Sequence, residues 1–294
     1  MINLGEVITA MVTPFDNDYN IDWKSTDKLM DYLIENGSDS LLLAGTTGES
    51  PALTDEEKIE LFKFGKKKFG SKVKIIAGTG SNSTHHTIEL SKKAAQAGAD
   101  ALLLVTPYYN KPTQSGLVNH FEEISNSVDI PMIVYNVPSR TCCNISSKTC
   151  VRISELKNII GVKEASGDLR QIAEIIRDTD KDSFMVYSGN DGDTFAVMTL
   201  GGAGVISVAS HIIGKEIKEM ASLIKQGNMA GAADMHKKYL DVFYGIFMTT
   251  SPIPIKKALN LKGINVGPLR PPLYDMEPQE EETFSRLLSK YNII

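Results

Sequence analysis

The sequence predicts a (β/α)8 TIM barrel with a C-terminal helical domain. Short apolar stretches of strand composition recur about every 25 to 35 residues, which leaves room for a helix between each pair and predicts a parallel sheet. Residues 36–43 and 97–104 repeat one pattern, in which a glycine ends a helix and a short loop leads into a buried strand. Eight such units indicate a closed barrel. The alternative is an open doubly wound sheet, but no Gly-x-Gly-x-x-Gly follows the first strand.

The elements follow from composition and from helix start and stop signals. The predicted strands are residues 6–13, 41–43, 73–77, 101–105, 132–135, 159–162, 184–187 and 204–208. Pro14 ends the first strand, Ser25 is the predicted N-cap of the first helix, and Gly37 ends that helix. Residues 54–57 have the pattern of a capping box, which predicts the start of the next helix.

The strand signal disappears from about residue 225. Residues 230–248, 255–261 and 280–291 are predicted helices, and a proline-rich connector precedes the last of them. We therefore expect a catalytic barrel in residues 1–224 and a helical domain in residues 225–294. Oligomerisation or support of the barrel is the simplest role for this second domain.

Composition narrows the class of protein. A net charge of -5 gives no reason to expect nucleic acid or an anionic membrane as a partner. No apolar run approaches the roughly 20 residues that span a bilayer, and the N-terminus lacks the features of a signal peptide. Cys142, Cys143 and Cys150 form no disulfide framework, which fits a reducing cytoplasm. Neither a Cys-x-x-Cys nor a His-x-x-x-His spacing occurs, so we expect no metal and no cofactor.

The active site of such a barrel lies at the carboxyl ends of its strands. The residues that follow the predicted strands are rich in hydroxyl groups and contain one lysine and one arginine, but no histidine. They are Thr13 and Pro14, residues 45–49, Thr79, residues 106–110, residues 135–140, Lys163, residues 188–190 and Ser207. Residues 201–204 resemble a phosphate loop, but they precede the last strand and therefore lie at the opposite end.

Lys163 directly follows the buried strand 159–162. Burial disfavours an ammonium ion, and a neutral amine attacks carbonyl carbon, so the lysine is a candidate for Schiff-base chemistry on a ketone or keto acid. Tyr135 can exchange protons with the reacting atoms, residues 45–48 can bind a carboxylate, and Arg140 can hold a second one.

Each of these side chains also has a simpler interpretation. A lysine can bury its stem while its head reaches water. Paired threonines beside glycine are common in turns, and Tyr135 suits any strand. Arg140 can be a surface loop residue, and Tyr108 and Tyr109 can pack at an interface.

Together the residues resemble the dihydrodipicolinate synthase family. Four motifs match that family in order and spacing over essentially the whole chain: Gly45-Thr46-Thr47-Gly48-Glu49-Ser50, Pro107-Tyr108-Tyr109-Asn110-Lys111-Pro112, Tyr135-Asn136-Val137-Pro138-Ser139-Arg140-Thr141 and Val162-Lys163-Glu164. The resemblance implies a cytoplasmic lyase of diaminopimelate and lysine biosynthesis. It also implies condensation of pyruvate with L-aspartate 4-semialdehyde, and a homotetramer built as a dimer of tight dimers.

The resemblance also implies a role for each site residue. Lys163 forms the Schiff base with pyruvate, and Tyr135 donates and accepts protons. Thr47 relays protons between Tyr135 and Tyr109, which comes from across the tight dimer interface. The remaining implied contacts are the backbone of Thr46 and Thr47 with the pyruvate carboxylate, Arg140 with the carboxylate of the semialdehyde, and Gly189 and Ile206 with the pocket near Lys163.

Two alternatives stay open at this point. N-acetylneuraminate lyase and other keto-acid aldolases of the same superfamily share the lysine and the tyrosine. Neuraminate lyases typically carry Ser-Thr in place of Thr46-Thr47 and lack the element that contains Arg140, which favours the synthase. A catalytically silent barrel that serves as a binding protein is disfavoured because Lys163 and Tyr135 are both present.

Feedback by lysine is a separate question. In feedback-sensitive relatives an allosteric lysine site uses positions that Ser50, Asn82 and Tyr108 match here. Lys58 replaces a histidine of that site, and His86 replaces a glutamate. Both changes disfavour a ligand with two ammonium groups, so weak or absent inhibition by lysine is expected.

Overall fold

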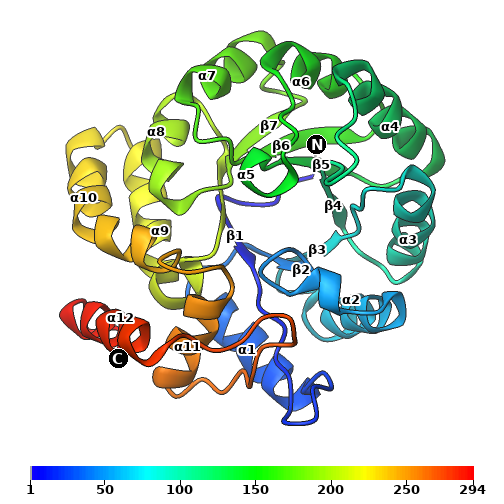
Figure 1. Ribbon diagram of the computed structural model, residues 1–294. Helices are drawn as coiled ribbons and strands as arrows, with labels where there is room; N and C mark the ends of the chain where they lie inside the picture. The colour runs from blue at the N-terminus through cyan, green and yellow to red at the C-terminus, as the bar shows by residue number, and fades with distance from the viewer. Residues whose placement is uncertain (1) are drawn as a thin grey trace.

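Eight parallel strands close into a barrel in the computed structural model, which describes residues 2–294 (Figure 1). The strands are β1 (Val7–Ala10), β2 (Ser40–Leu43), β3 (Lys74–Gly78), β4 (Ala101–Val105), β5 (Met132–Asn136), β6 (Ile159–Glu164), β7 (Met185–Ser188) and β8 (Gly204–Ser207). Each strand pairs with its neighbours in sequence, and β8 closes the sheet onto β1. The predicted (β/α)8 barrel is confirmed.

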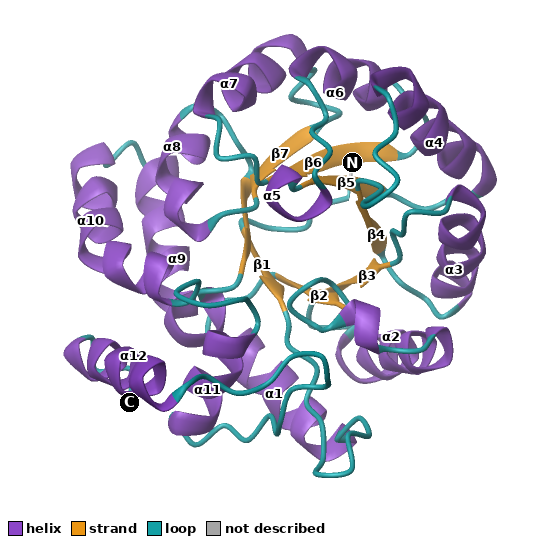
Figure 2. Ribbon diagram, viewed as in Figure 1, coloured by secondary structure: helices purple, strands orange, loops and turns teal. Residues whose placement is uncertain are grey.

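Helices surround the strands on the outside (Figure 2). The longer ones are α1 (Trp23–Glu35), α2 (Asp55–Phe69), α3 (Thr84–Gln96), α4 (Gln114–Ser127), α6 (Ser147–Ser154), α7 (Leu169–Asp178) and α9 (Ser210–Lys225). Short elements lie in the loops between them: η1 (Ser50–Ala52), α5 (Pro138–Thr141), η2 (Asp191–Asp193) and α8 (Thr194–Thr199). These loop elements matter for function because most of them follow a strand at its carboxyl end.

The start of α1 corrects one prediction. Asp22, not Ser25, is the N-cap, and its carboxylate accepts hydrogen bonds from the backbone N–H groups of Lys24 and Ser25. Ser25 lies inside the first turn and donates its hydroxyl to the same carboxylate. Both residue types favour a cap, and the carboxylate receives the backbone donors here. The capping box at Thr54 and Glu57 is confirmed.

Strand β6 is longer than its apolar run. It continues through Lys163 to Glu164, and Lys163 pairs in register with Tyr135 of β5. The apolar run ends at Val162, but the ladder is made by backbone groups, so pairing continues past the first charged side chain. This extension places Lys163 and Tyr135 side by side at the carboxyl end of the barrel.

Buried apolar side chains of residues 2–294 form three clusters, and the two larger ones build the barrel. The larger lies between the strands and the helices, and the smaller fills the barrel interior. The interior group includes Ile8, Leu42, Ile76, Ile133, Tyr187 and Ile206, with Tyr135 and Ala165 nearest the carboxyl end. The barrel is therefore packed below the level of Lys163, which confines any substrate to its mouth.

Three helices follow the barrel: α10 (Met229–Gly245), α11 (Ile253–Leu261) and α12 (Pro278–Lys290). Helices α10 and α11 pack on α9, and α12 packs on both of them (Figure 1). We propose that these helices form the second domain expected in residues 225–294. None of the helices within residues 2–294 combines the length and the apolar character needed to cross a membrane.

Candidate active site

Lys163 and Tyr135 form the centre of the candidate site. The Lys163 Nζ atom lies 4.4 Å from the centroid of the Tyr135 ring, and the lysine side chain is buried at 5% exposure. Burial and, to a smaller extent, the positive charge of Arg140 lower the pKa of Lys163 to about 8, against the opposing effect of the Asp191 carboxyl group. About a tenth of the amine is therefore neutral at pH 7, far more than for a lysine in water, and the neutral form is the nucleophile.

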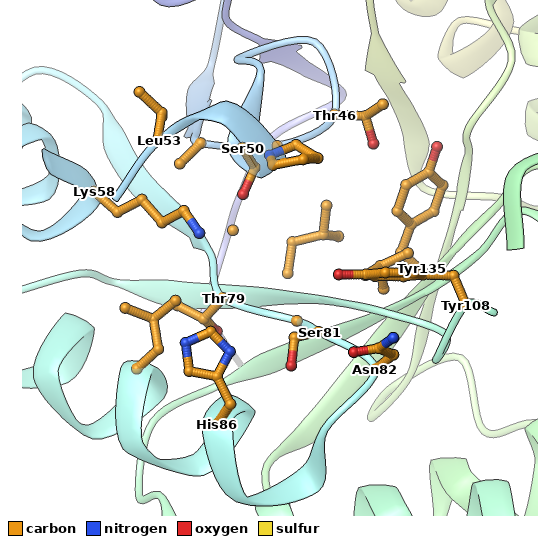
Figure 3. Close-up of a pocket in the computed structure, with 18 of the residues that line it drawn as sticks. Thr46, Ser50, Leu53, Lys58, Thr79, Ser81, Asn82, His86, Tyr108 and Tyr135 are labelled. Carbon is orange, nitrogen blue, oxygen red and sulfur yellow. The ribbon is translucent and has the colours of Figure 1, made fainter. Parts of the chain in front are cut away.

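Tyr135 keeps its proton at neutral pH. Burial raises the pKa of its phenol to about 12, against the opposing effects of Arg140 and of a side-chain hydrogen bond with Thr46. The Tyr135 phenol and the Thr46 side chain lie on the same side of the cavity in Figure 3. A protonated phenol beside a neutral amine can protonate an oxygen that leaves during imine formation.

The turn after β2 faces this pair. Ser50 N–H donates to the Gly45 carbonyl and Glu49 N–H donates to the Thr46 carbonyl, so the turn is closed by its own backbone. The backbone N–H groups of Thr46 and Thr47 donate to no acceptor within residues 2–294. Two free N–H groups in one turn are donors for a small carboxylate.

A cavity of about 550 Å³ opens beside these groups (Figure 3). Thr46, Tyr135 and Arg140 line one part of it. Lys163 is not among the residues that line this cavity. Its Nζ atom lies beside the ring of Tyr135, which does line it. Arg140 lies on α5, is exposed, and donates a hydrogen bond of 3.4 Å to the Ser251 carbonyl. Its guanidinium group can bind an anion at the mouth of the barrel.

The other predicted site residues divide into two groups. Thr47 is buried in the turn, Ile206 is fully buried in β8, and Gly189 N–H donates to the Glu164 carbonyl at the end of β6. A Cβ atom at Gly189 would lie only 2.6 Å from the Cβ atom of Ala165, so this position requires glycine. Tyr109 differs from the rest, because it is 89% exposed and does not line the cavity of its own chain.

The five residues matched to the allosteric site line a second part of the same cavity. They are Ser50, Lys58, Asn82, His86 and Tyr108 (Figure 3). The Lys58 side chain is almost buried, with its Nζ atom 3.7 Å from Asp55, whose other oxygen lies 2.7 Å from the His86 Nε2 atom. Burial lowers the pKa of Lys58, while Asp55 favours its charged form.

Two buried carboxyl groups near Lys163 were missed by sequence reasoning. Asp191 follows β7 and accepts hydrogen bonds from the Ser207 hydroxyl and from the backbone N–H groups of Val208 and Ala209. Burial raises the pKa of Asp191, and the charge of Lys163 opposes this. The sequence does carry a signal for Asp191, because this residue directly follows the segment 188–190 at the end of the seventh predicted strand.

Glu164 is the second missed group. Its carboxyl oxygens accept hydrogen bonds from the Asn136 side chain, the Gln171 side chain and the Ser166 backbone N–H. Burial raises the pKa of Glu164. These bonds join the ends of β5 and β6, the strands that carry Tyr135 and Lys163, and so fix the two side chains relative to each other. Within residues 2–294 no three His, Cys, Asp or Glu side chains are grouped as a metal site would need.

Comparison with known proteins agrees with this geometry. The model of the dihydrodipicolinate synthetase family matches residues 3–291. The 4-hydroxy-tetrahydrodipicolinate synthase of Bacillus velezensis is 47% identical over 289 residues, which cover 98% of this chain and all of the relative.

Solved structures give the same result. The dihydrodipicolinate synthase of Cyanidioschyzon merolae with lysine bound has a TM-score of 0.96 and 44% identity, covering 99% of both chains. The chloride-inhibited enzyme of Acinetobacter baumannii complexed with pyruvate has a TM-score of 0.96 and 39% identity, covering 99% of this chain and 100% of that one. The chain belongs to the dihydrodipicolinate synthetase family.

Proposed function

We propose that the chain is a lyase that condenses pyruvate with L-aspartate 4-semialdehyde, the activity of a 4-hydroxy-tetrahydrodipicolinate synthase. The observation that carries the proposal is the buried Lys163 amine, with its pKa lowered to about 8, beside the protonated phenol of Tyr135. Relatives that share nearly the full length of the chain bear this name. A related enzyme has been solved in complex with pyruvate.

The first half of the reaction activates pyruvate. The neutral Lys163 amine attacks the keto carbon, a carbon–nitrogen double bond forms, and the keto oxygen leaves as water after protonation by Tyr135. The free N–H groups of Thr46 and Thr47 hold the pyruvate carboxylate during this step. The Tyr135 phenolate left by that step then takes a proton from the methyl carbon, and the iminium nitrogen accepts the electron pair, which gives an enamine.

The second half forms the new carbon–carbon bond and then releases the product, when the amino group of the former semialdehyde attacks the iminium carbon and displaces the Lys163 amine. The enamine carbon attacks the aldehyde carbon of the semialdehyde, and a proton transferred through Tyr135 and Thr47 neutralises the resulting alkoxide. The relay continues to Tyr109, which is supplied by a neighbouring subunit. Support for this last step is the exposure of Tyr109 and its absence from the cavity lining of its own chain.

The proposed assembly is a homotetramer, a dimer of tight dimers, located in the cytoplasm. A tight dimer would cover Tyr108 and Tyr109, which are 39% and 89% exposed in the single chain. Exposed aromatic side chains are enriched at protein interfaces. The assembly therefore completes the proton relay as well as burying apolar surface.

Arg140 is the proposed anchor for the carboxylate of the semialdehyde. We expect Arg140→Ala to raise KM for the semialdehyde and lower kcat/KM by about 30-fold or more, because loss of one partner of a charged pair costs about 2–5 kcal/mol. Adduct formation with pyruvate should change little. Steady-state kinetics and trapping of the pyruvate adduct measure the two effects. Equal losses in both assays would mean that Arg140 supports structure instead.

Substrate preference is the direct test of the proposed function. A coupled assay with pyruvate should show rapid consumption of L-aspartate 4-semialdehyde, and no cleavage of N-acetylneuraminate in the same preparation. Arg140 suits a short second substrate with a carboxylate rather than an extended sugar acid. Cleavage of N-acetylneuraminate without turnover of the semialdehyde would replace the proposal with the aldolase function.

Inhibition by lysine should be weak or absent. Two positive charges about 4 Å apart repel by about 1 kcal/mol in water and by more at a protein surface, and Lys58 reaches into the part of the cavity that a lysine ligand would occupy (Figure 3). Initial rates at increasing lysine concentration measure this effect. Strong inhibition at sub-millimolar lysine would contradict it, and Lys58→His should increase sensitivity relative to the unsubstituted chain.

A further inference from the structure

A buried ion pair joins the C-terminal helices to the turn that carries Thr46 and Thr47. Lys256 on α11 donates from Nζ to the Oε1 atom of Glu49 at 2.7 Å, and the two side chains are 2% and 1% exposed. The same Nζ atom donates to the Pro268 carbonyl at 2.6 Å. An ion pair so far from water retains its attraction only when its remaining polar contacts are also satisfied, as they are here.

Arg270 completes the contact from the same C-terminal segment. Its backbone N–H donates to the second carboxylate oxygen of Glu49 at 2.8 Å. Its guanidinium group bonds to both oxygens of Glu57 on α2 and to the Tyr19 and Ala52 carbonyls. Both carboxylate oxygens of Glu49 are therefore held by residues that lie more than 200 positions later in the chain.

Phe15, in the loop that follows β1, packs against the same two cations. The Lys256 Nζ atom and the Arg270 guanidinium carbon each lie 4.3 Å from the centroid of its ring. A cation over an aromatic face is attracted by the ring quadrupole. The cluster is therefore a packed unit of two cations, the carboxylates of Glu49 and Glu57 and one aromatic ring, rather than a single contact.

Glu49 links these contacts to the backbone of the turn that carries Thr46 and Thr47. Its backbone has φ 56° and ψ 37°, in the left-handed region that a side-chain-bearing residue adopts only when its surroundings hold it there. From this position its N–H donates to the Thr46 carbonyl at 3.1 Å. A displacement of Glu49 would therefore reorient the peptide formed by the Thr46 carbonyl and the Thr47 N–H group, and that N–H group is one of the two free donors.

We propose that Glu49, Lys256 and Arg270 are positioning residues that hold the Thr46–Thr47 turn in its pyruvate-binding geometry. The inference rests on the proposed role of that turn as the carboxylate site. It assigns the C-terminal helical segment a part in substrate binding beyond support of the barrel. Neutral groups of similar size could pack in the same place, so the charges act here by fixing direction: each carboxylate oxygen has one defined donor.

A second contact places the same segment at the other side of the site. The Ser251 carbonyl, two residues before α11, accepts the 3.4 Å hydrogen bond from Arg140. One segment thus contacts the turn that carries the free N–H groups and also the arginine at the cavity mouth.

The test uses the double variant Glu49→Gln/Lys256→Met. It removes both charges of the buried pair, so neither residue remains as an unpaired buried charge. The readout is the pyruvate concentration that gives half-maximal borohydride trapping on Lys163, which involves no second substrate. We expect this concentration to rise about 10- to 100-fold, by analogy with the loss of affinity when a residue that orients a metal ligand is removed. The maximal extent of trapping should be retained.

A matched control comes from the same C-terminal segment. Lys290 and Asp241 form an exposed ion pair at 2.8 Å, and Lys290→Met/Asp241→Asn should leave half-saturation unchanged. Glu49→Gln alone serves if the double variant does not fold, because Lys256, whose pKa is already lowered to about 8, can lose its proton when unpaired.

The outcomes separate the inference from the proposed function. Wild-type half-saturation in a folded Glu49 variant overturns the inference, and so does a smaller trapped fraction at unchanged half-saturation, which indicates a purely structural role. Failure of the unsubstituted chain to form any adduct on Lys163 overturns the proposed function itself, and with it the basis of the inference.

Discussion

Lys163→Met is expected to abolish the pyruvate adduct and to lower kcat by about 10³-fold or more, the scale seen when a covalent nucleophile is removed. Methionine keeps most of the buried volume of lysine and removes only the amine, so the fold should be retained. Mass spectrometry after borohydride reduction measures the adduct, and a coupled assay measures turnover. Lys72→Met is the matched control, since Lys72 is exposed and paired with Asp31.

The pH dependence of kcat/KM for pyruvate is a second test of the role of Lys163. Below a pKa of about 8 the Lys163 amine is mostly protonated and cannot attack a carbonyl. The value of kcat/KM for pyruvate should therefore rise with pH, reach half its maximum near pH 8 and level off above that pH. Full activity of Lys163→Met, or a profile that falls as pH rises from 6 to 8, would contradict the role of Lys163.

Tyr135→Phe should lower kcat by about 10²- to 10⁴-fold, the usual contribution of a positioned general acid or base. Phenylalanine retains the ring beside the Lys163 amine and loses only the phenol, which burial keeps protonated. Thermal unfolding should therefore change little while adduct formation slows. Stopped reactions followed by mass spectrometry measure that slowing. A variant with wild-type rates of adduct formation and turnover would show that another group moves the protons.

Much of the fold was predictable because local patterns specify it. Each strand is a short apolar run between turn residues, and each helix start carries a local signal such as the box at Thr54 and Glu57. Once the barrel is inferred, the rule that active sites lie at the carboxyl ends of strands selects Thr46, Tyr135 and Lys163 without reference to any partner.

Other features depend on contacts between distant parts of the chain. Glu49 and Lys256 are 207 residues apart, and neither has a neighbouring residue that predicts the other. The pKa of Lys163 depends on its burial and on Arg140 and Asp191, which come from different loops. Tyr109 does not line the cavity of its own chain, so its proposed role in the proton relay depends on a second subunit. Such pairings follow from tertiary and quaternary structure, which no local pattern encodes.

The most direct test of the account is borohydride reduction of the unsubstituted protein in the presence of pyruvate, followed by peptide mapping. We expect one pyruvyl group for each chain, on Lys163 alone, because this is the lysine buried beside Tyr135 at the barrel mouth with a pKa lowered to about 8. Absence of an adduct, or an adduct on another lysine, would contradict the central claim.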